Sequence, residues 1–288
     1  MKSATMLLFL SVSLNLCVST SCSSNNFPKY EQLGGLRVLG LRADLASASG
    51  QAEFSPGDSV VLTPYISDFG GAGRQLTYTA SGCVDPGIGL GVTPSCAGVP
   101  GVTVLGSGNV ILTGAVSYTG QANTIAVQIP STIFTNQSAA AQYNGVNYIV
   151  TYQITAPDGT SVASFKRLPV SVSSKIKNQN PVLNSILANG APLSTLPAGV
   201  VTLGAGYTAA SIESYSIMNP DTTLQPEVEQ LLTTFFVTDG TLDIGRVIND
   251  EIANYTPPGS APTDHSAIVV EMVRDGRGGE AFFLQKLN

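Results

Sequence analysis

The sequence is poor in the residues from which most active sites are built. It has no tryptophan and a single histidine, His265, among 288 residues. A catalytic metal site usually needs several histidines with carboxylates. A nucleotide enzyme needs a glycine-rich loop and a serine hydrolase needs a nucleophile elbow, and neither motif is present. The sequence therefore predicts that the chain is not an enzyme and that it needs no cofactor.

Charged side chains are scarce as well. They make up 11% of the chain, less than half of the usual share of about 25%. The net charge is −6, so a phosphate backbone would be repelled and nucleic acid is not an expected partner. Salt-bridged helices need more charge than this, whereas the 30 glycines suit turns. The composition favours an exported, all-β protein.

Cysteine is limited to four residues, and two of them lie in an apolar N-terminal segment. Residues 6–18 form an almost unbroken apolar run after Lys2, and small residues at 19–21 precede Cys22. A membrane-spanning helix needs about 20 apolar residues, so this run is typical of a secretory signal. We expect a lipoprotein signal peptide of residues 1–22 in which Cys22 becomes the lipidated first residue. Simple cleavage without a lipid is the alternative.

A lipid on Cys22 would anchor the chain to a membrane. No aspartate follows Cys22, which in a Gram-negative lipoprotein favours sorting to the outer membrane. Residues 23–35 would form a flexible tether. The predicted localisation is therefore the cell envelope, with the chain held at the outer membrane by its lipid.

Cys83 and Cys96 remain to pair with each other. The loop between them is rich in glycine and proline and closes about 14 residues, so the disulfide should add roughly 3 kcal/mol of stability. A redox or metal pair is the alternative, but no third ligand lies nearby in the sequence. We expect a disulfide that fixes an irregular loop.

The pattern of strands divides the chain into two units. Short β-branched or alternating runs recur at the spacing of a β-sandwich, and one short helix is expected between residues 131 and 141. The polar segment 173–181 marks a boundary, so we predict one sandwich at 36–174 and a second at 175–288. Each half ends with two β runs around an Asp-Gly turn, at 158–159 and at 275–276, which indicates an internal repeat.

Several stretches resemble bacterial Ig-like repeats found in tandem in uncharacterised outer-membrane lipoproteins of myxobacterial and predatory Gram-negative type. The resemblance rests on the segments 54–63, 76–78, 235–243, 255–258 and 273–279. It implies two tandem Ig-like β-sandwiches and no settled activity. The chain departs from the pattern because Thr79 or Ala80, and Phe235 or Phe236, stand where a tryptophan is expected.

Two groups of residues could carry chemistry. His265 follows Asp264, a pair that suits general-base catalysis, but a solvated residue at the start of a strand is the preferred interpretation. Carboxylates in the region 239–251 could hold calcium through their oxygens, although their spacing fits no EF-hand loop and turn residues on an acidic surface are preferred. These weak candidates are Asp239, Asp243, Asp250 and Glu251.

The leading hypothesis is a non-enzymatic envelope lipoprotein that displays Ig-like domains as a binding or spacer surface. Its expected partners are a membrane, through the lipid on Cys22, and an envelope protein or glycan. One alternative is a secreted or surface adhesin for glycan or protein, either with or without a need for calcium. Another is an accessory subunit of an envelope complex.

Overall fold

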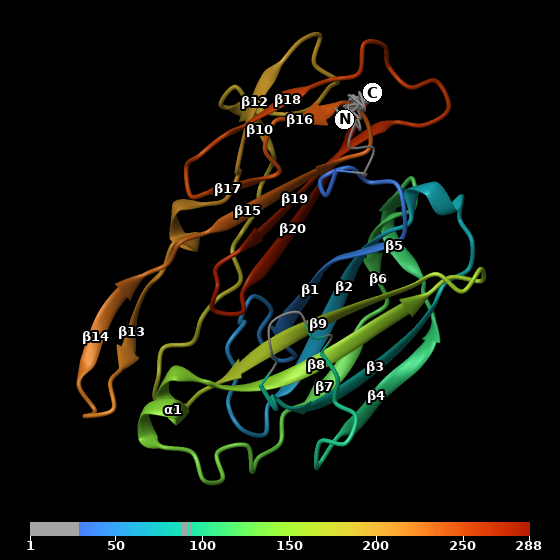
Figure 1. Cartoon of the computed structure of the whole chain (residues 1–288). Helices are drawn as coiled ribbons and strands as arrows, with labels where there is room; N and C mark the ends of the chain where they lie inside the picture. The colour runs from blue at the N-terminus through green and yellow to red at the C-terminus, as the bar shows by residue number, and fades with distance from the viewer. Residues whose placement is uncertain (1–28, 88–91, 93) are drawn as a thin grey trace, which may run out of the picture.

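The computed structural model describes residues 29–87, 92 and 94–288, so the predicted signal segment and Cys22 lie outside the described residues. Strands hold 48% of the chain and helices 5%, which confirms the all-β prediction. Within the described ranges, no helix is long and apolar enough to cross a membrane. The strands form two β-sandwich units that follow one another along the chain (Figure 1).

The first unit is a sandwich of two antiparallel sheets. One sheet has the order β1-β2-β6-β5 with β7 also paired to β2, and the other has the order β4-β3-β8-β9. Helix α1 precedes β8, and its N-cap Ser138 accepts a hydrogen bond from Ala141 N. The elements are β1 (Arg37–Leu45), β2 (Ser59–Ser67), β3 (Thr77–Val84), β4 (Thr103–Asn109), β5 (Leu112–Val116), β6 (Thr119–Ala122), β7 (Ile125–Gln128), α1 (Ala139–Asn144), β8 (Val146–Thr155) and β9 (Ser161–Val170).

The second unit repeats this plan with extra short strands. Its four-stranded sheet β17-β15-β19-β20 has the same order as β4-β3-β8-β9, and its second sheet runs β11-β10-β12-β18-β16. A separate hairpin, β13–β14, projects from the unit (Figure 1). The elements are β10 (Leu187–Ala188), β11 (Ala191–Pro192), β12 (Val201–Gly204), β13 (Ser214–Met218), β14 (Leu224–Val228), β15 (Leu232–Val237), β16 (Thr241–Leu242), β17 (Arg246–Ile248), β18 (Ala253–Thr256), β19 (Ala267–Arg274) and β20 (Glu280–Leu287).

Each unit has its own apolar core between its two sheets. In β8 the alternate residues Tyr148, Val150, Tyr152 and Ile154 are all buried in the first core. This period of two places one face of the strand inward, as expected for a sandwich. The alternation that predicts the strands from the sequence therefore also predicts the core.

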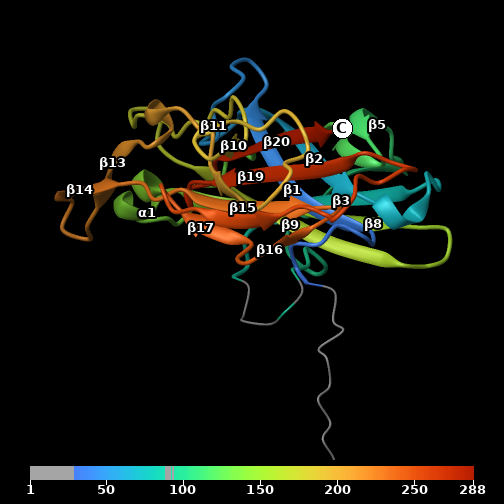
Figure 2. The same cartoon turned by 90° about the horizontal axis from the view of Figure 1, so that it is seen from above.

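A third apolar cluster joins the two units. Strand β19 is buried on both faces, since Val269 packs in the second core while Val270 packs against the first unit. Tyr65 of β2 stacks on Phe282 of β20 with ring centroids 4.1 Å apart. Figure 2 shows β19 and β20 running alongside β1 and β2. The units are therefore packed together rather than joined by a linker alone.

Two segments that the sequence assigns to flexible connections are part of this packing. In the predicted tether 23–35, Leu33 N donates to Val237 O at 2.7 Å, and the Leu33 side chain is buried. The tether prediction is therefore wrong for this end of the segment, because the apolar Leu33 finds a site beside the edge of β15.

The polar segment at the domain boundary is also buried. Asn178 and Asn180 expose 0% and 4% of their surface. Asn180 Nδ2 donates to Ala43 O at 2.8 Å, and Glu280 N donates to Asn180 Oδ1 at 2.7 Å. The side chain of Asn180 thus bonds the first unit and the second, which explains why this buried amide is tolerated.

Candidate functional site: a cleft between the two units

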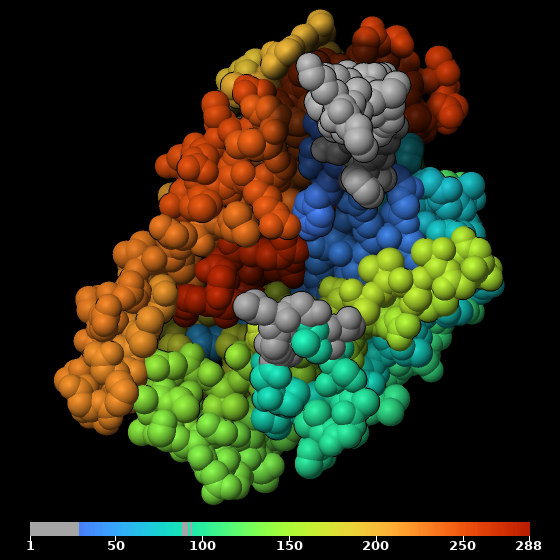
Figure 3. Space-filling view, viewed as in Figure 1, coloured from blue at the N-terminus to red at the C-terminus, as the bar shows by residue number. Residues whose placement is uncertain are grey.

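A cleft of about 370 Å³ lies where the two units meet. The first unit and the boundary segment line it with Glu53, Asn144, Gly145, Asn147, Arg167, Pro169 and Lys175, and the second unit lines it with Tyr215, Ser216, Ile217, Gly276, Arg277 and Gly278. A second hollow of about 390 Å³ shares Arg167, Gly276 and Gly278 with it. Figure 3 shows the surface hollowed between α1, the β13–β14 hairpin and the β19–β20 turn.

The turn between β19 and β20 carries an arginine into the interface beside the cleft. Asp275 Oδ1 accepts hydrogen bonds from Arg277 N at 2.7 Å and from Gly279 N at 2.9 Å. Gly276 has a φ of 75°, a conformation that glycine adopts readily. The predicted Asp-Gly turn therefore exists. The Asp275 carboxylate fixes the backbone of the turn so that the Arg277 side chain points into the interface.

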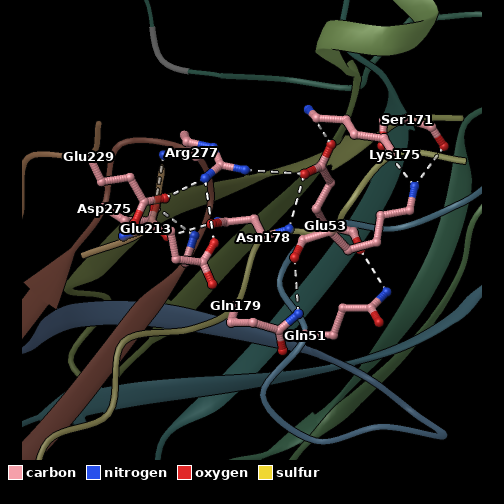
Figure 4. A network of polar contacts seen from close by, with 12 residues as sticks. Gln51, Glu53, Ser171, Lys175, Asn178, Gln179, Glu213, Glu229, Asp275 and Arg277 are labelled. Atoms are coloured by element: carbon pink, nitrogen blue, oxygen red, sulfur yellow. Dashed lines mark hydrogen bonds and ion pairs between the residues drawn. The ribbon is translucent and has the colours of Figure 1, made fainter. Parts of the chain in front are cut away.

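Arg277 connects acids of both units (Figure 4). Its Nη1 lies 2.6 Å from Glu229 Oε1 of the second unit, and its Nη2 lies 3.5 Å from Glu53 Oε2 of the first. Its guanidinium carbon also lies 4.1 Å from the centroid of the Tyr215 ring. A planar guanidinium that is paired and stacked in this way has little freedom to move.

Glu53 is the acid of the first unit that receives these contacts. Lys175 Nζ donates to its Oε1 at 2.7 Å, and Asn178 N donates to its Oε2 at 3.1 Å. Burial by itself raises the pKa of Glu53, but the hydrogen bonds from Lys175, Ser171 and Asn178 N and the charge of Lys175 together outweigh burial and lower the pKa. Glu53 is therefore a charged group that ties the boundary segment to the first unit.

Three acidic residues of the second unit, Glu213, Glu229 and Asp275, lie close to Arg277. Burial raises the pKa of Glu229 to about 7, and the neighbouring Asp275 and Glu213 add to the rise while Arg277 opposes it. Burial also raises the pKa of Glu213. The pairing of Arg277 with Glu229 of its own unit is thus sensitive to protonation near neutral pH.

The charge that the cleft exposes to solvent is positive. Arg167 exposes 41% of its side chain, whereas its partner Asp85, 2.6 Å away, exposes 11%. Glu53, the one carboxylate that lines the cleft among the described residues, exposes 3% of its side chain. An anionic group entering the cleft would therefore meet an accessible cation.

The predicted disulfide is present. Cys83 at the end of β3 is bonded to Cys96, with a Cα–Cα distance of 5.8 Å. Both residues are buried and pack against Ile149 of β8. The bond joins the loop after β3 to the four-stranded sheet of the first unit. The other predicted site cysteine, Cys22, lies outside the described residues.

The four weak calcium candidates occupy separate places. Asp243 Oδ1 accepts from Asn254 N at 2.7 Å, Asp250 Oδ1 accepts from the Tyr207 hydroxyl at 3.4 Å, Glu251 Oε2 accepts from Ile248 N at 2.9 Å, and Asp239 contacts His265. In the part of the chain that the structure describes, no three acidic, histidine or cysteine side chains gather as metal ligands. The carboxylates instead serve local turns and hydrogen bonds.

His265 lies between two carboxylates. Its Nδ1 is 2.7 Å from Asp264 Oδ1, and its Nε2 is 3.0 Å from Asp239 Oδ2. Burial by itself lowers the pKa of His265, but the hydrogen bonds with Asp264 and Asp239 and the negative charges of these carboxylates together outweigh burial and raise the pKa. Because both ring nitrogens are paired with carboxylates, the arrangement favours an imidazolium over a general base. Its ring also meets Phe69 of the first unit edge-on, with centroids 4.9 Å apart.

Reasoning from the sequence missed the cleft and its network. The residues come from four distant stretches, around positions 53, 175, 229 and 277, and their pairing depends on how the units pack. One signal was available, since a chain with few charges places lysine or arginine at 166, 167, 175 and 177, close to the boundary. That clustering could have indicated a charged contact between the units.

Comparison with known proteins gives no family. No family model matches the chain, and no curated protein matches it. A solved structure that it resembles is the transglutaminase of red sea bream, with a TM-score of 0.27 and 9% sequence identity, over 89% of this chain and 32% of that one. The chain thus spans about a third of the length of that structure.

One prediction is withdrawn. The chain is no longer expected to lack enzymatic activity. The likeness is too distant to assign an activity to the chain.

Proposed function

We propose that the protein is a lipid-anchored component of the cell envelope that displays two packed Ig-like sandwiches and binds a partner in the cleft between them. The observation that carries the proposal is the construction of the cleft. Both units line it, and three of the lining residues, Glu53, Lys175 and Arg277, belong to a buried network that also includes Asn178. Binding sites are commonly concave and formed at domain interfaces.

The fixed contact between the units also suits a spacer. The units share an apolar cluster and a hydrogen-bonded boundary segment, so the cleft would keep one shape while the body is held away from the membrane. The anchor itself is proposed from the sequence of residues 1–22, with Cys22 as the lipidated residue. An accessory role within an envelope complex uses the same cleft and the same anchor.

The anchor can be tested by expressing the full chain in a Gram-negative bacterium and measuring the mass of its mature N-terminal peptide. The proposal predicts a peptide that begins at Cys22 and carries acyl chains, with the protein in the outer-membrane fraction. Cys22→Ala should abolish the lipid and release the protein from the membrane. Cys17→Ala, a matched change within the signal, should leave both unaltered. A mature chain that begins elsewhere, without lipid, would contradict the proposed anchoring.

A further inference from the structure

The hairpin β13–β14 has two outer edges that differ in what they can bind. At its ends, Glu229 N donates to Glu213 O at 3.0 Å and Asn219 N donates to Thr223 O at 2.9 Å. In an antiparallel pair the bonded and non-bonded residue pairs alternate. Residues 213, 215, 217 and 219 therefore bond across the hairpin. Ser214, Ser216 and Met218 instead direct their backbone N–H and C=O groups away from β14.

The outer edge of β14 is protected. Pro226 lies opposite Ser216, at a non-bonded pair, so its nitrogen is on the outer side of β14. Proline has no N–H to offer an incoming strand, and proteins use it to protect edges in this way. The corresponding position on the outer edge of β13 is a serine, which retains its N–H.

At the outer edge of β13, one side chain makes the hydrogen bonds that a neighbouring strand would make. Asn144 Nδ2 at the end of α1 donates to Met218 O at 2.8 Å, and Met218 N donates to Asn144 Oδ1 at 2.7 Å. These are the two bonds that a residue of an added strand would make. Ser216 is the next equivalent position and lines the cleft. Within the described residues, no hydrogen bond reaches its backbone N–H or C=O.

We propose that the edge of β13 receives an extended, acidic polypeptide segment as an added strand in the cleft. Ser216 N–H and C=O would exchange hydrogen bonds with one residue of the segment, in line with the bonds of Asn144 at Met218. Main-chain pairing of this kind gives affinity, and side chains give selectivity. The exposed guanidinium of Arg167 and the scarcity of accessible carboxylate in the cleft lining favour glutamate or aspartate side chains.

This inference deepens the proposed function, because it names the partner class for the same cleft. The probe is an eight-residue peptide of alternating threonine and glutamate, titrated calorimetrically into the purified full chain. A peptide of alternating threonine and lysine is the charge control. Binding is measured on the isolated protein, so a failure of the lipid anchor and a failure of peptide binding are separate outcomes.

Ser216→Pro is the decisive variant. It removes an N–H that β14 does not use, so the hairpin should persist, and it should weaken binding of the glutamate peptide at least tenfold. Val228→Pro makes the same change at a non-bonded position of β14, on the outer edge away from the cleft, and should bind like the unaltered protein. Ser216→Ala controls for loss of the hydroxyl and should also bind normally. Melting temperatures establish that each variant is folded.

A second readout does not depend on any variant. The amide of Ser216 should exchange rapidly in the free protein and become protected when the glutamate peptide is bound. The inference is overturned if the glutamate peptide does not bind, if Ser216→Pro binds it as tightly as Val228→Pro, or if the Ser216 amide exchanges equally fast with and without peptide. Equal affinity for the lysine peptide would overturn the assignment of an acidic segment.

Discussion

A buried glutamate in the second unit should make the stability of the protein depend on pH. Glu271 lies on β19, exposes 0% of its surface, and has one oxygen near Gly206 N at 3.3 Å. Its other oxygen has no partner among the described residues. Burial raises the pKa of Glu271 to about 8 from an ordinary value of 4.5, and the hydrogen bond from Gly206 opposes this rise.

The sign of the effect follows from proton binding. Between pH 4.5 and pH 8 the folded protein holds a proton on Glu271 that the unfolded chain releases, so stability falls as pH rises. Each pH unit in this range costs about 1.4 kcal/mol, which amounts to about 3 to 4 kcal/mol between pH 5 and pH 8. Glu271→Gln has nearly the same shape and does not titrate. The unfolding free energy of Glu271→Gln minus that of the unaltered protein should therefore increase by about 3 to 4 kcal/mol from pH 5 to pH 8.

Urea unfolding followed by far-ultraviolet circular dichroism measures this difference, since the chain has no tryptophan for fluorescence. Comparing variant with unaltered protein at each pH cancels the titration of the groups that they share, such as Glu229. Glu227→Gln, on the surface hairpin, controls for the change in net charge. A difference in unfolding free energy that stays constant from pH 5 to pH 8 would show that the carboxyl is not neutralised by burial.

Three further predictions concern the disulfide, the contact between the units, and calcium. Replacing both Cys83 and Cys96 by alanine should lower the unfolding free energy by about 3 kcal/mol, and adding reductant to the unaltered protein should have a similar effect in urea unfolding. A decrease in unfolding free energy well under 1 kcal/mol would show that the disulfide does not stabilise the loop. Gly40→Val should strain the contact between the units, because its side chain would displace the buried side-chain ends of Met272 and Glu280. It should lower the melting temperature by several degrees, whereas Gly35→Val, with open space around it, should change it little. An unchanged melting temperature in Gly40→Val would contradict the packing described for β1 and β20. Millimolar calcium should not shift the melting temperature, because the carboxylates at 239, 243, 250 and 251 are engaged in separate contacts; a rise of several degrees would restore the calcium hypothesis.

The sequence predicted the features that depend on local pattern. Three of them appear in the structure: the alternating strand β8, the turn at Asp275 and the disulfide between Cys83 and Cys96. Each depends on residues that are close to one another in the sequence. The apolar run of β19 also carried a signal that was not used. A strand without alternation is typical of burial on both faces, which is what the contact between the units imposes on it.

The sequence did not predict features whose cause lies in the other unit. Asn178 and Asn180 are polar and precede a proline, which is the composition of a linker, yet their amides are buried because Asp275, Ala43 and Glu280 pair with them. The β13–β14 hairpin was missed because β14 has a proline at its centre, Pro226, and one β-branched residue, Val228. The cleft depends on both of these segments and therefore could not be read from the sequence.

The claim on which the account depends most is that the two units form one body around the cleft. Hydrogen exchange at the backbone amides of Asn178 and Asn180 tests it directly, since these amides bond to Glu53 Oε2 and to Gly50 O of the first unit. The account predicts that they exchange as slowly as the core amides of β8, with opening that requires global unfolding. Exchange at the rate of an exposed linker would mean that the units move independently and that the cleft has no fixed shape.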